Sequence, residues 1–120
     1  MARILIIDDE REVRMALRAI LERAGHTVIE APNGDQGARL YALSPTEVVI
    51  TDIVMPGKDG VETLMELRAD FPNIKIIVIS GEADDLLPAV QQFGARFAFP
   101  KPLRSKEILA AIDELLAEDA

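Results

Sequence analysis

Hydrophobic residues follow two spacings along this chain, and the two alternate. Short hydrophobic runs recur five times, and between them hydrophobic residues fall three or four positions apart. A run of consecutive aliphatic residues is typical of a strand buried on both faces, whereas the wider spacing gathers hydrophobic side chains on one face of a helix. The pattern predicts strands at Arg3–Ile7, at Thr27–Ala31, in the run that begins at Val48 and ends in Thr51 and Asp52, at Ile74–Ile79 and at Arg96–Phe99.

The helical spacing is clearest in the first predicted helix. Within Val13–Ala24, hydrophobic residues fall at i, i+3, i+4, i+7, i+8 and i+11, and Gly25 supplies a residue that ends a helix. A second, weaker helix runs from the turn at Pro32–Gly34 to about Leu43, where Gly37 costs about 1 kcal/mol relative to alanine. The other expected helices are Gly60–Ala69, a short helix that starts near Leu86 because Pro88 is tolerated only in a first turn, and Ser105–Ala117.

Strand and helix patterns therefore alternate five times with short connections. This alternation indicates a parallel sheet with helices on both of its faces. A chain of 120 residues forms one domain, and a content of 49% hydrophobic residues is enough for a folded core. The expected architecture is a single doubly wound α/β domain.

Charge and composition narrow the classes of function. The formal charge of −8 opposes binding to nucleic acid, because that affinity depends on Lys and Arg. The chain has no cysteine, which excludes disulfides, thiolate nucleophiles and cysteine-ligated metals. No hydrophobic run approaches the roughly 20 residues that cross a bilayer, and no signal-peptide pattern precedes the first strand. We therefore expect a cytoplasmic protein that binds neither nucleic acid nor membrane.

Chemically useful side chains follow four of the five predicted strands. The first strand ends in Asp8 and Asp9, and the later ones end in Asp52, Ser80 and Lys101. In an open parallel sheet these ends share one edge, where ligands bind. Clustered carboxylates suit a hard divalent cation, and a hydroxyl with an ammonium can hold phosphate oxygens. Asp52 alone could equally cap the next helix, but the whole group indicates a site for a metal and a phosphate.

Six short motifs of the chain also occur together in a known family. They are Ile7–Glu10, Asp52–Gly57, Asp59–Gly60, Ser80, Gly94–Ala95 and Lys101–Pro102. In this order and spacing the whole chain resembles the receiver domains of two-component response regulators. The resemblance implies one receiver domain at residues 1–120, with a CheY-like, flavodoxin-like (βα)5 fold whose five parallel strands lie in the order 2-1-3-4-5. It also implies a single-domain response regulator in a two-component phosphorelay.

The resemblance gives each strand-end residue a role. Asp52, which we expect to be an exposed strand-end carboxylate, accepts a phosphoryl group from a histidine kinase or a histidine phosphotransfer protein. Lys101 and Ser80 then contact the phosphoryl oxygens. The implied Mg²⁺ ligands are Asp8, Asp9, Asp52 and the backbone carbonyl of Val54. The chain would signal to, or relay phosphate to, a partner protein, and it would not be an enzyme beyond its own Mg²⁺-dependent phosphorylation and dephosphorylation.

Some positions depart from the family pattern. Ala98 stands where receivers usually carry an aromatic switch residue, and Phe97 and Phe99 should point to the opposite side of the strand because side chains alternate. Arg96 and Phe97 stand where the family often has two acidic residues used for dimerisation, which favours a monomer. The resemblance also implies that the Lys101–Pro102 peptide bond is cis.

Other interpretations remain open at this point. A hydrolase of the haloacid-dehalogenase-like type would use Asp52 as its nucleophile, but it needs an acidic residue two positions on, where this chain has Val54. A scaffold that is never phosphorylated would not need the intact acidic cluster and Lys101. The same receiver could belong to a longer regulator, although Met1 and the complete final helix favour a stand-alone protein.

Overall fold

The computed structural model describes residues 2–53, 60–81, 90–92 and 94–118. The elements are β1 (Arg3–Ile7), α1 (Arg11–Arg23), β2 (Thr27–Ala31), α2 (Gly34–Leu43), β3 (Val48–Asp52), α3 (Gly60–Asp70), β4 (Ile76–Ser80), β5 (Phe97–Pro100) and α5 (Ser105–Ala117). Residues 90–92 are also helical, and the start of the short helix expected near Leu86 lies outside the described residues. No helix in these ranges is long and apolar enough to cross a membrane.

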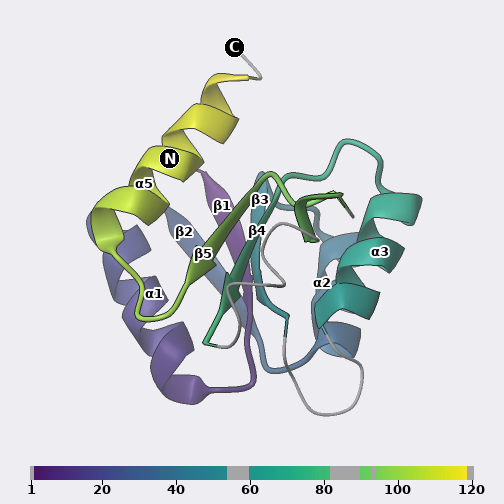
Figure 1. The fold of residues 1–120 in the computed structure, drawn as a ribbon, viewed down its shortest axis with the longest axis horizontal. Coiled ribbons are helices and arrows are strands. Elements are labelled where there is room, and N and C mark those ends of the chain that lie inside the picture. The colour runs from purple at the N-terminus through teal and green to yellow at the C-terminus, as the bar shows by residue number, and fades with distance from the viewer. Residues whose placement is uncertain (1, 54–59, 82–89, 93, 119–120) are drawn as a thin grey trace.

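The strands form one parallel sheet in the order β2-β1-β3-β4-β5, as predicted (Figure 1). Every residue of the inner strands β3 and β4 is buried, and so is β1 apart from Arg3, which explains their aliphatic runs. β2, which has no functional group at its end, lies at an edge of the sheet. Because neighbouring strands run parallel and in close register, their carboxyl ends meet at one edge of the sheet.

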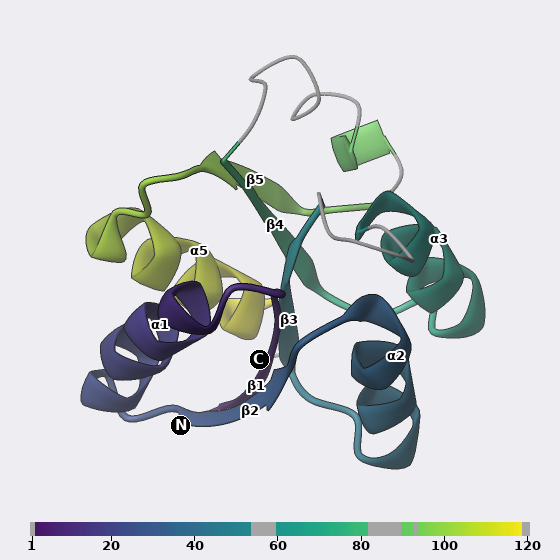
Figure 2. The same ribbon diagram turned by 90° about the horizontal axis from the view of Figure 1, so that it is seen from below.

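Helices cover both faces of this sheet (Figure 2). α1 and α5 pack on one face, and α2 and α3 pack on the other. Side chains alternate along β1, so that Ile4 and Ile6 join the core under α1 and α5, whereas Leu5 and Ile7 join the core under α2 and α3. The protein therefore has the doubly wound α/β fold that the alternating patterns predict.

The hydrophobic stripe of α1 faces two environments. Leu17 and Leu21 are buried in the core, whereas Val13 and Ile20 are only partly buried and Ala16 is exposed. The stripe is wider than the core requires. The outer residues of the stripe therefore lie at the surface, where they face the segment that leads into α5.

Two strands and one helix differ slightly from their predicted bounds. β4 begins at Ile76 rather than at Ile74, because the N–H of Ile74 donates to the Phe71 carbonyl at 3.0 Å and so belongs to the preceding turn. β5 is shifted by one residue, to Phe97–Pro100. α3 extends one residue beyond its predicted end, to Asp70.

The side chains of β5 alternate as predicted. Phe97 and Phe99 pack against the core under α1 and α5, with ring centroids 6.1 Å apart, and Ala98 packs against the opposite core. The Lys101–Pro102 bond that follows β5 is cis, which confirms the prediction.

Candidate functional site

The first site residues lie where β1 passes into α1. Asp8 directly follows β1 and is fully buried. Its Oδ1 accepts a hydrogen bond from the Glu10 N–H at 2.8 Å, and its own N–H donates to the Ala31 carbonyl at 3.1 Å. This turn leaves Asp9 and Glu10 exposed beside the buried aspartate.

Asp52 is the last residue of β3, the middle strand of the sheet. We expected an exposed carboxylate, and that expectation is wrong, because only 3% of the residue is exposed. β1 and β4 flank β3 on both sides, and the Lys101 ammonium lies against the Asp52 carboxylate. Asp52 is therefore a buried, paired charge.

Lys101 joins the two buried carboxylates. Its Nζ lies 3.2 Å from Asp8 Oδ2, 3.0 Å from Asp52 Oδ2 and 3.2 Å from Glu10 Oε1. The backbone N–H of Lys101 donates a hydrogen bond at 2.7 Å to the backbone carbonyl of Ser80, the buried last residue of β4. The predicted side-chain members of the site all lie at this edge of the sheet, namely Asp8, Asp9, Asp52, Ser80 and Lys101. The predicted carbonyl ligand of Val54 lies outside the described residues.

Two groups in the cluster have shifted pKa values. Burial raises the pKa of the Asp8 carboxyl above its ordinary value, and repulsion by Asp52 adds to this, while the Glu10 N–H and Lys101 act in the opposite direction. Burial by itself would lower the pKa of Lys101, but its hydrogen bond to Asp52 and the charges of Asp8 and Asp52 outweigh burial and raise it. The lysine therefore stays a cation at neutral pH.

The acidic cluster suits a magnesium ion. One carboxylate oxygen from each of Asp8, Asp9, Glu10 and Asp52 lies within 4.8 Å of the others. Mg²⁺ prefers oxygen ligands and keeps several waters, which the exposed side of this cluster allows. Glu10 was not predicted as a site residue. In the sequence, Glu10 is the last residue of the motif Ile7–Glu10, but its part in the cluster depends on the turn after Asp8, which returns its side chain to the other carboxylates.

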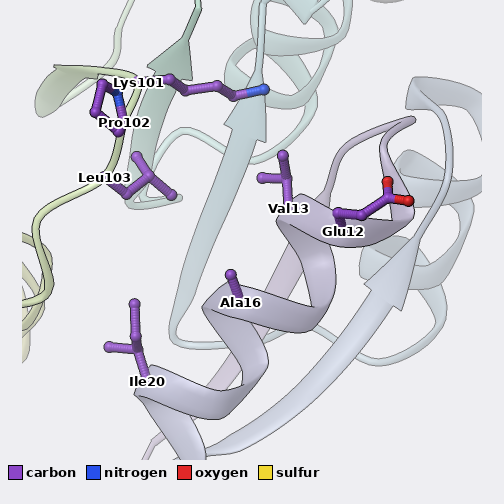
Figure 3. A pocket seen from close by; sticks show the side chains of 7 residues that line it. All are labelled: Glu12, Val13, Ala16, Ile20, Lys101, Pro102 and Leu103. Atoms are coloured by element: carbon purple, nitrogen blue, oxygen red, sulfur yellow. The ribbon is translucent and has the colours of Figure 1, made fainter.

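An apolar pocket of about 250 Å³ lies beside the carboxylates (Figure 3). It is lined by Glu12, Val13, Ala16 and Ile20 of α1 and by Lys101, Pro102 and Leu103 after β5. In Figure 3 the α1 residues follow one another along the helix, and Pro102 and Leu103 lie opposite them. Because Lys101 both lines the pocket and contacts Asp52, a molecule that covers the pocket also adjoins the carboxylates.

Comparison with known proteins places these features in one family. The family model of the response regulator receiver domain matches residues 4–113. The chain is 37% identical to Protein PilH of Pseudomonas aeruginosa, in a match that covers 98% of this chain and 99% of PilH. It is 36% identical to the sensor kinase CckA of Brucella abortus over 96% of this chain, but it spans only 12% of CckA. The structure of response regulator protein TrrA from Thermotoga maritima in complex with Mg(2+)-BeF matches with a TM-score of 0.89 and 28% identity, over 96% of this chain and 99% of TrrA.

The chain therefore belongs to the response regulator receiver domain family. It has the CheY-like receiver fold and is a phosphate-accepting regulator of two-component signalling, with the acidic pocket formed by Asp8, Asp9 and Asp52. Receiver domains bind Mg²⁺ and interact with histidine kinases or phosphotransfer proteins. Such a domain is not a catalytic enzyme apart from its own phosphorylation chemistry.

Proposed function

We propose that Asp52 accepts the phosphoryl group and that residues 1–120 work as one receiver domain. The observation that carries this proposal is the contact of Lys101 Nζ with Asp52 at 3.0 Å and with Asp8 at 3.2 Å, which provides a cation where phosphoryl oxygens would arrive. The central position of β3 in the sheet also supports Asp52.

In the proposed reaction a carboxylate oxygen of Asp52 attacks the phosphorus atom of a phosphohistidine. A P–O bond forms and the P–N bond breaks, and the electron pair remains on the imidazole nitrogen, which takes up a proton. Lys101 neutralises charge on the phosphoryl oxygens, and the Ser80 hydroxyl donates to one of them. Mg²⁺, when bound, would supply further positive charge beside the phosphoryl group. Its proposed ligands are Asp8, Asp9, Asp52 and the Val54 carbonyl.

The proposed phosphodonor is a histidine kinase or a histidine phosphotransfer protein that covers the pocket between α1 and the segment after β5. The pocket is apolar and adjoins Lys101, so apolar side chains beside the donor's phosphohistidine would fill it while the imidazole reaches Asp52. The match over nearly the full length of PilH supports a single-domain regulator. Such a regulator signals to a separate protein or relays phosphate to it.

A cytoplasmic monomer is part of the same proposal. Family membership supports the location. Arg96 stands where other receivers use acidic residues to dimerise, and here it pairs with Glu118 just after α5 of the same chain, with Nη1 2.7 Å from Oε1 and a second contact between Nη2 and Oε2. This internal pairing satisfies the charge of Arg96 without a second copy of the chain.

Transfer of labelled phosphate from candidate histidine kinases tests the assignment of Asp52. The wild type should take up label in the presence of Mg²⁺, and Asp52→Ala and Asp52→Asn should not. Asp113→Asn, which changes an exposed carboxylate of α5, is the matched control and should be labelled normally. Label at the wild-type level in both Asp52 variants would sink the assignment. Sustained turnover of a phosphate ester that depends on Asp52 would favour the hydrolase interpretation instead.

A further inference from the structure

Arg14 connects the acidic loop after β1 to the edge strand β2. Arg14 lies in the first turn of α1. Its Nη1 donates a hydrogen bond to the Asp8 backbone carbonyl at 2.6 Å, and its Nε donates to Glu30 Oε1 at 3.0 Å. Only 16% of the Arg14 side chain is exposed. The guanidinium therefore lies fixed between one acceptor in the loop and one in β2.

The Asp8 carbonyl belongs to the loop that carries the carboxylates. Within this loop, Asp8 Oδ1 accepts from the Glu10 N–H at 2.8 Å, and the Glu10 carbonyl accepts from the Arg14 N–H at 3.2 Å. The Arg14 side chain adds a further hydrogen bond to this loop, from its Nη1 to the Asp8 carbonyl. A charged donor at 2.6 Å makes a stronger hydrogen bond than a neutral one, so Arg14 fixes the peptide group between Asp8 and Asp9.

Glu30 is shared by two arginines of α1. Its Oε1 accepts from Arg14, and its Oε2 accepts from Arg18 Nη1 at 2.7 Å. Arg18 Nη2 donates to the Val28 carbonyl at 2.8 Å. The two arginines thus make similar ion pairs with Glu30 and differ in their second contact, because Arg14 reaches the acidic loop and Arg18 reaches the backbone of β2.

We propose that Arg14, held by Glu30, is a positioning residue that sets the geometry of the Asp8–Glu10 loop and thereby the affinity of the site for Mg²⁺. Residues that orient metal ligands commonly change metal affinity tenfold or more when they are replaced. Through the ligands, Arg14 also sets the rate at which Asp52 is phosphorylated. This second effect rests on the proposed function, whereas the effect on Mg²⁺ affinity does not.

The test compares Arg14→Gln with Arg18→Gln in the full chain. Isothermal titration with Mg²⁺ should give an affinity about tenfold weaker than wild type for Arg14→Gln and an unchanged affinity for Arg18→Gln. Arg14→Lys should be intermediate, because an ammonium can bond the Asp8 carbonyl or Glu30 but does not span both. With acetyl phosphate as donor at subsaturating Mg²⁺, labelling of Asp52 should slow in the same order and recover for Arg14→Gln at saturating Mg²⁺.

Three results would overturn this inference. They are an unchanged Mg²⁺ affinity in a folded Arg14→Gln, an equal loss of affinity in Arg14→Gln and Arg18→Gln, and an Arg14→Lys variant no better than Arg14→Gln. Amide spectra of each variant without metal show whether it is folded. If wild-type Asp52 takes up no label, the proposed function fails, but the Mg²⁺ titrations still decide the role of Arg14.

Discussion

The buried carboxylates at the strand ends depend on Lys101. Moving a charge out of water is costly, and an ion pair offsets that cost only when its partner remains close. Nζ contacts Asp8 and Asp52 at 3.2 and 3.0 Å, and Glu10 adds a further carboxylate at 3.2 Å. Among the described residues one ammonium faces these three carboxylates, so this group of side chains carries excess negative charge, which attracts a divalent cation.

Gly37 is required by close packing of α2 on β1. A Cβ at this position would lie 2.3 Å from Ile7 Cδ1 and 2.6 Å from Ile7 Cγ1, and Ile7 is fully buried. Gly37→Ala should therefore lower the free energy of unfolding, because overpacking costs about 1–3 kcal/mol and exceeds the gain of about 1 kcal/mol in helix propensity. Urea unfolding of the variant measures the difference.

Ile7→Val provides the control, because it removes the Cδ1 atom nearest to the added methyl group. The double variant should be more stable than the sum of the two single changes predicts. A Gly37→Ala variant more stable than the wild type would show that α2 can move away from β1 at little cost.

Tyr41 makes the fold sensitive to alkaline pH. It is the only tyrosine in the chain, is 7% exposed and packs edge-on against Phe71. Burial raises the pKa of its phenol above the ordinary value of 10.0. Since the folded pKa is the higher one, the stability that the neutral phenol contributes is complete below pH 10 and is lost as the pH rises through the folded pKa.

Ultraviolet titration of this single phenol should therefore give a higher midpoint in the folded protein than in urea. Tyr41→Phe should lose less stability than the wild type between pH 9 and about 11, a range that spans the ordinary tyrosine pKa. Equal midpoints in the folded and unfolded protein would contradict the effect of burial.

At the scale of single residues, the sequence predicted the site residues that lie at the carboxyl ends of strands. It did not predict residues whose long side chains contact the site from another element. Asp52 and Lys101 were predictable because the ends of parallel strands share an edge. The role of Arg14 was not, because it depends on a side chain that extends from α1 to the Asp8 carbonyl. Glu30 was not predicted either, because its contact with Arg14 also joins two separate elements, and because it lies in a strand whose end carries no reactive group.

Among the elements, α1 contributes to both the core and the surface. Leu17 and Leu21 are buried, while Val13, Ala16 and Ile20 line the pocket beside Lys101. Periodicity identified the helix, but it could not separate these two groups, because both belong to one continuous stripe. The separation depends on how far α5 and the segment before it extend over α1.

A large charged side chain in this pocket should block a protein donor and leave small donors unaffected. Ala16→Arg should reduce the rate of phosphotransfer from a cognate histidine kinase at least tenfold, because it fills the apolar pocket and brings a charge into the interface. Labelling by acetyl phosphate should stay within about twofold of wild type, a difference of only about 0.4 kcal/mol.

Ala19→Arg is the matched control, because Ala19 is also exposed on α1 but does not line the pocket. It should accept phosphate from both donors normally. Equal losses in the two variants, or a loss with acetyl phosphate in Ala16→Arg, would contradict the docking of the donor at this pocket.

For the whole molecule, the alternation of patterns predicted a parallel sheet, but it left the strand order open. β1, β3 and β4 are all buried on both faces, so their sequences do not show which strand lies next to which. The order 2-1-3-4-5 came from the resemblance to receiver domains, and the structure confirms it. That order makes β1 and β3 neighbours, so Asp8 and Asp52 lie at adjacent strand ends.

Binding of Mg²⁺ should stabilise the folded protein, because the unfolded chain does not bring the four carboxylates together. At ten times its Kd, a ligand that binds only the folded state adds about 1.4 kcal/mol. For a domain of this size that raises Tm by about 5 °C. Thermal unfolding at constant ionic strength, with and without millimolar MgCl₂, measures the shift.

Asp9→Asn and Asp113→Asn separate specific binding from a general effect of salt on a chain of formal charge −8. Both residues are exposed, and each change removes one negative charge, but only Asp9 belongs to the cluster. Asp9→Asn should reduce the Mg²⁺-dependent rise in Tm, since it removes a ligand from the site, whereas Asp113→Asn should retain it. A wild-type Tm that does not change with millimolar Mg²⁺, or an equal reduction in both variants, would mean that the carboxylates are not a specific magnesium site.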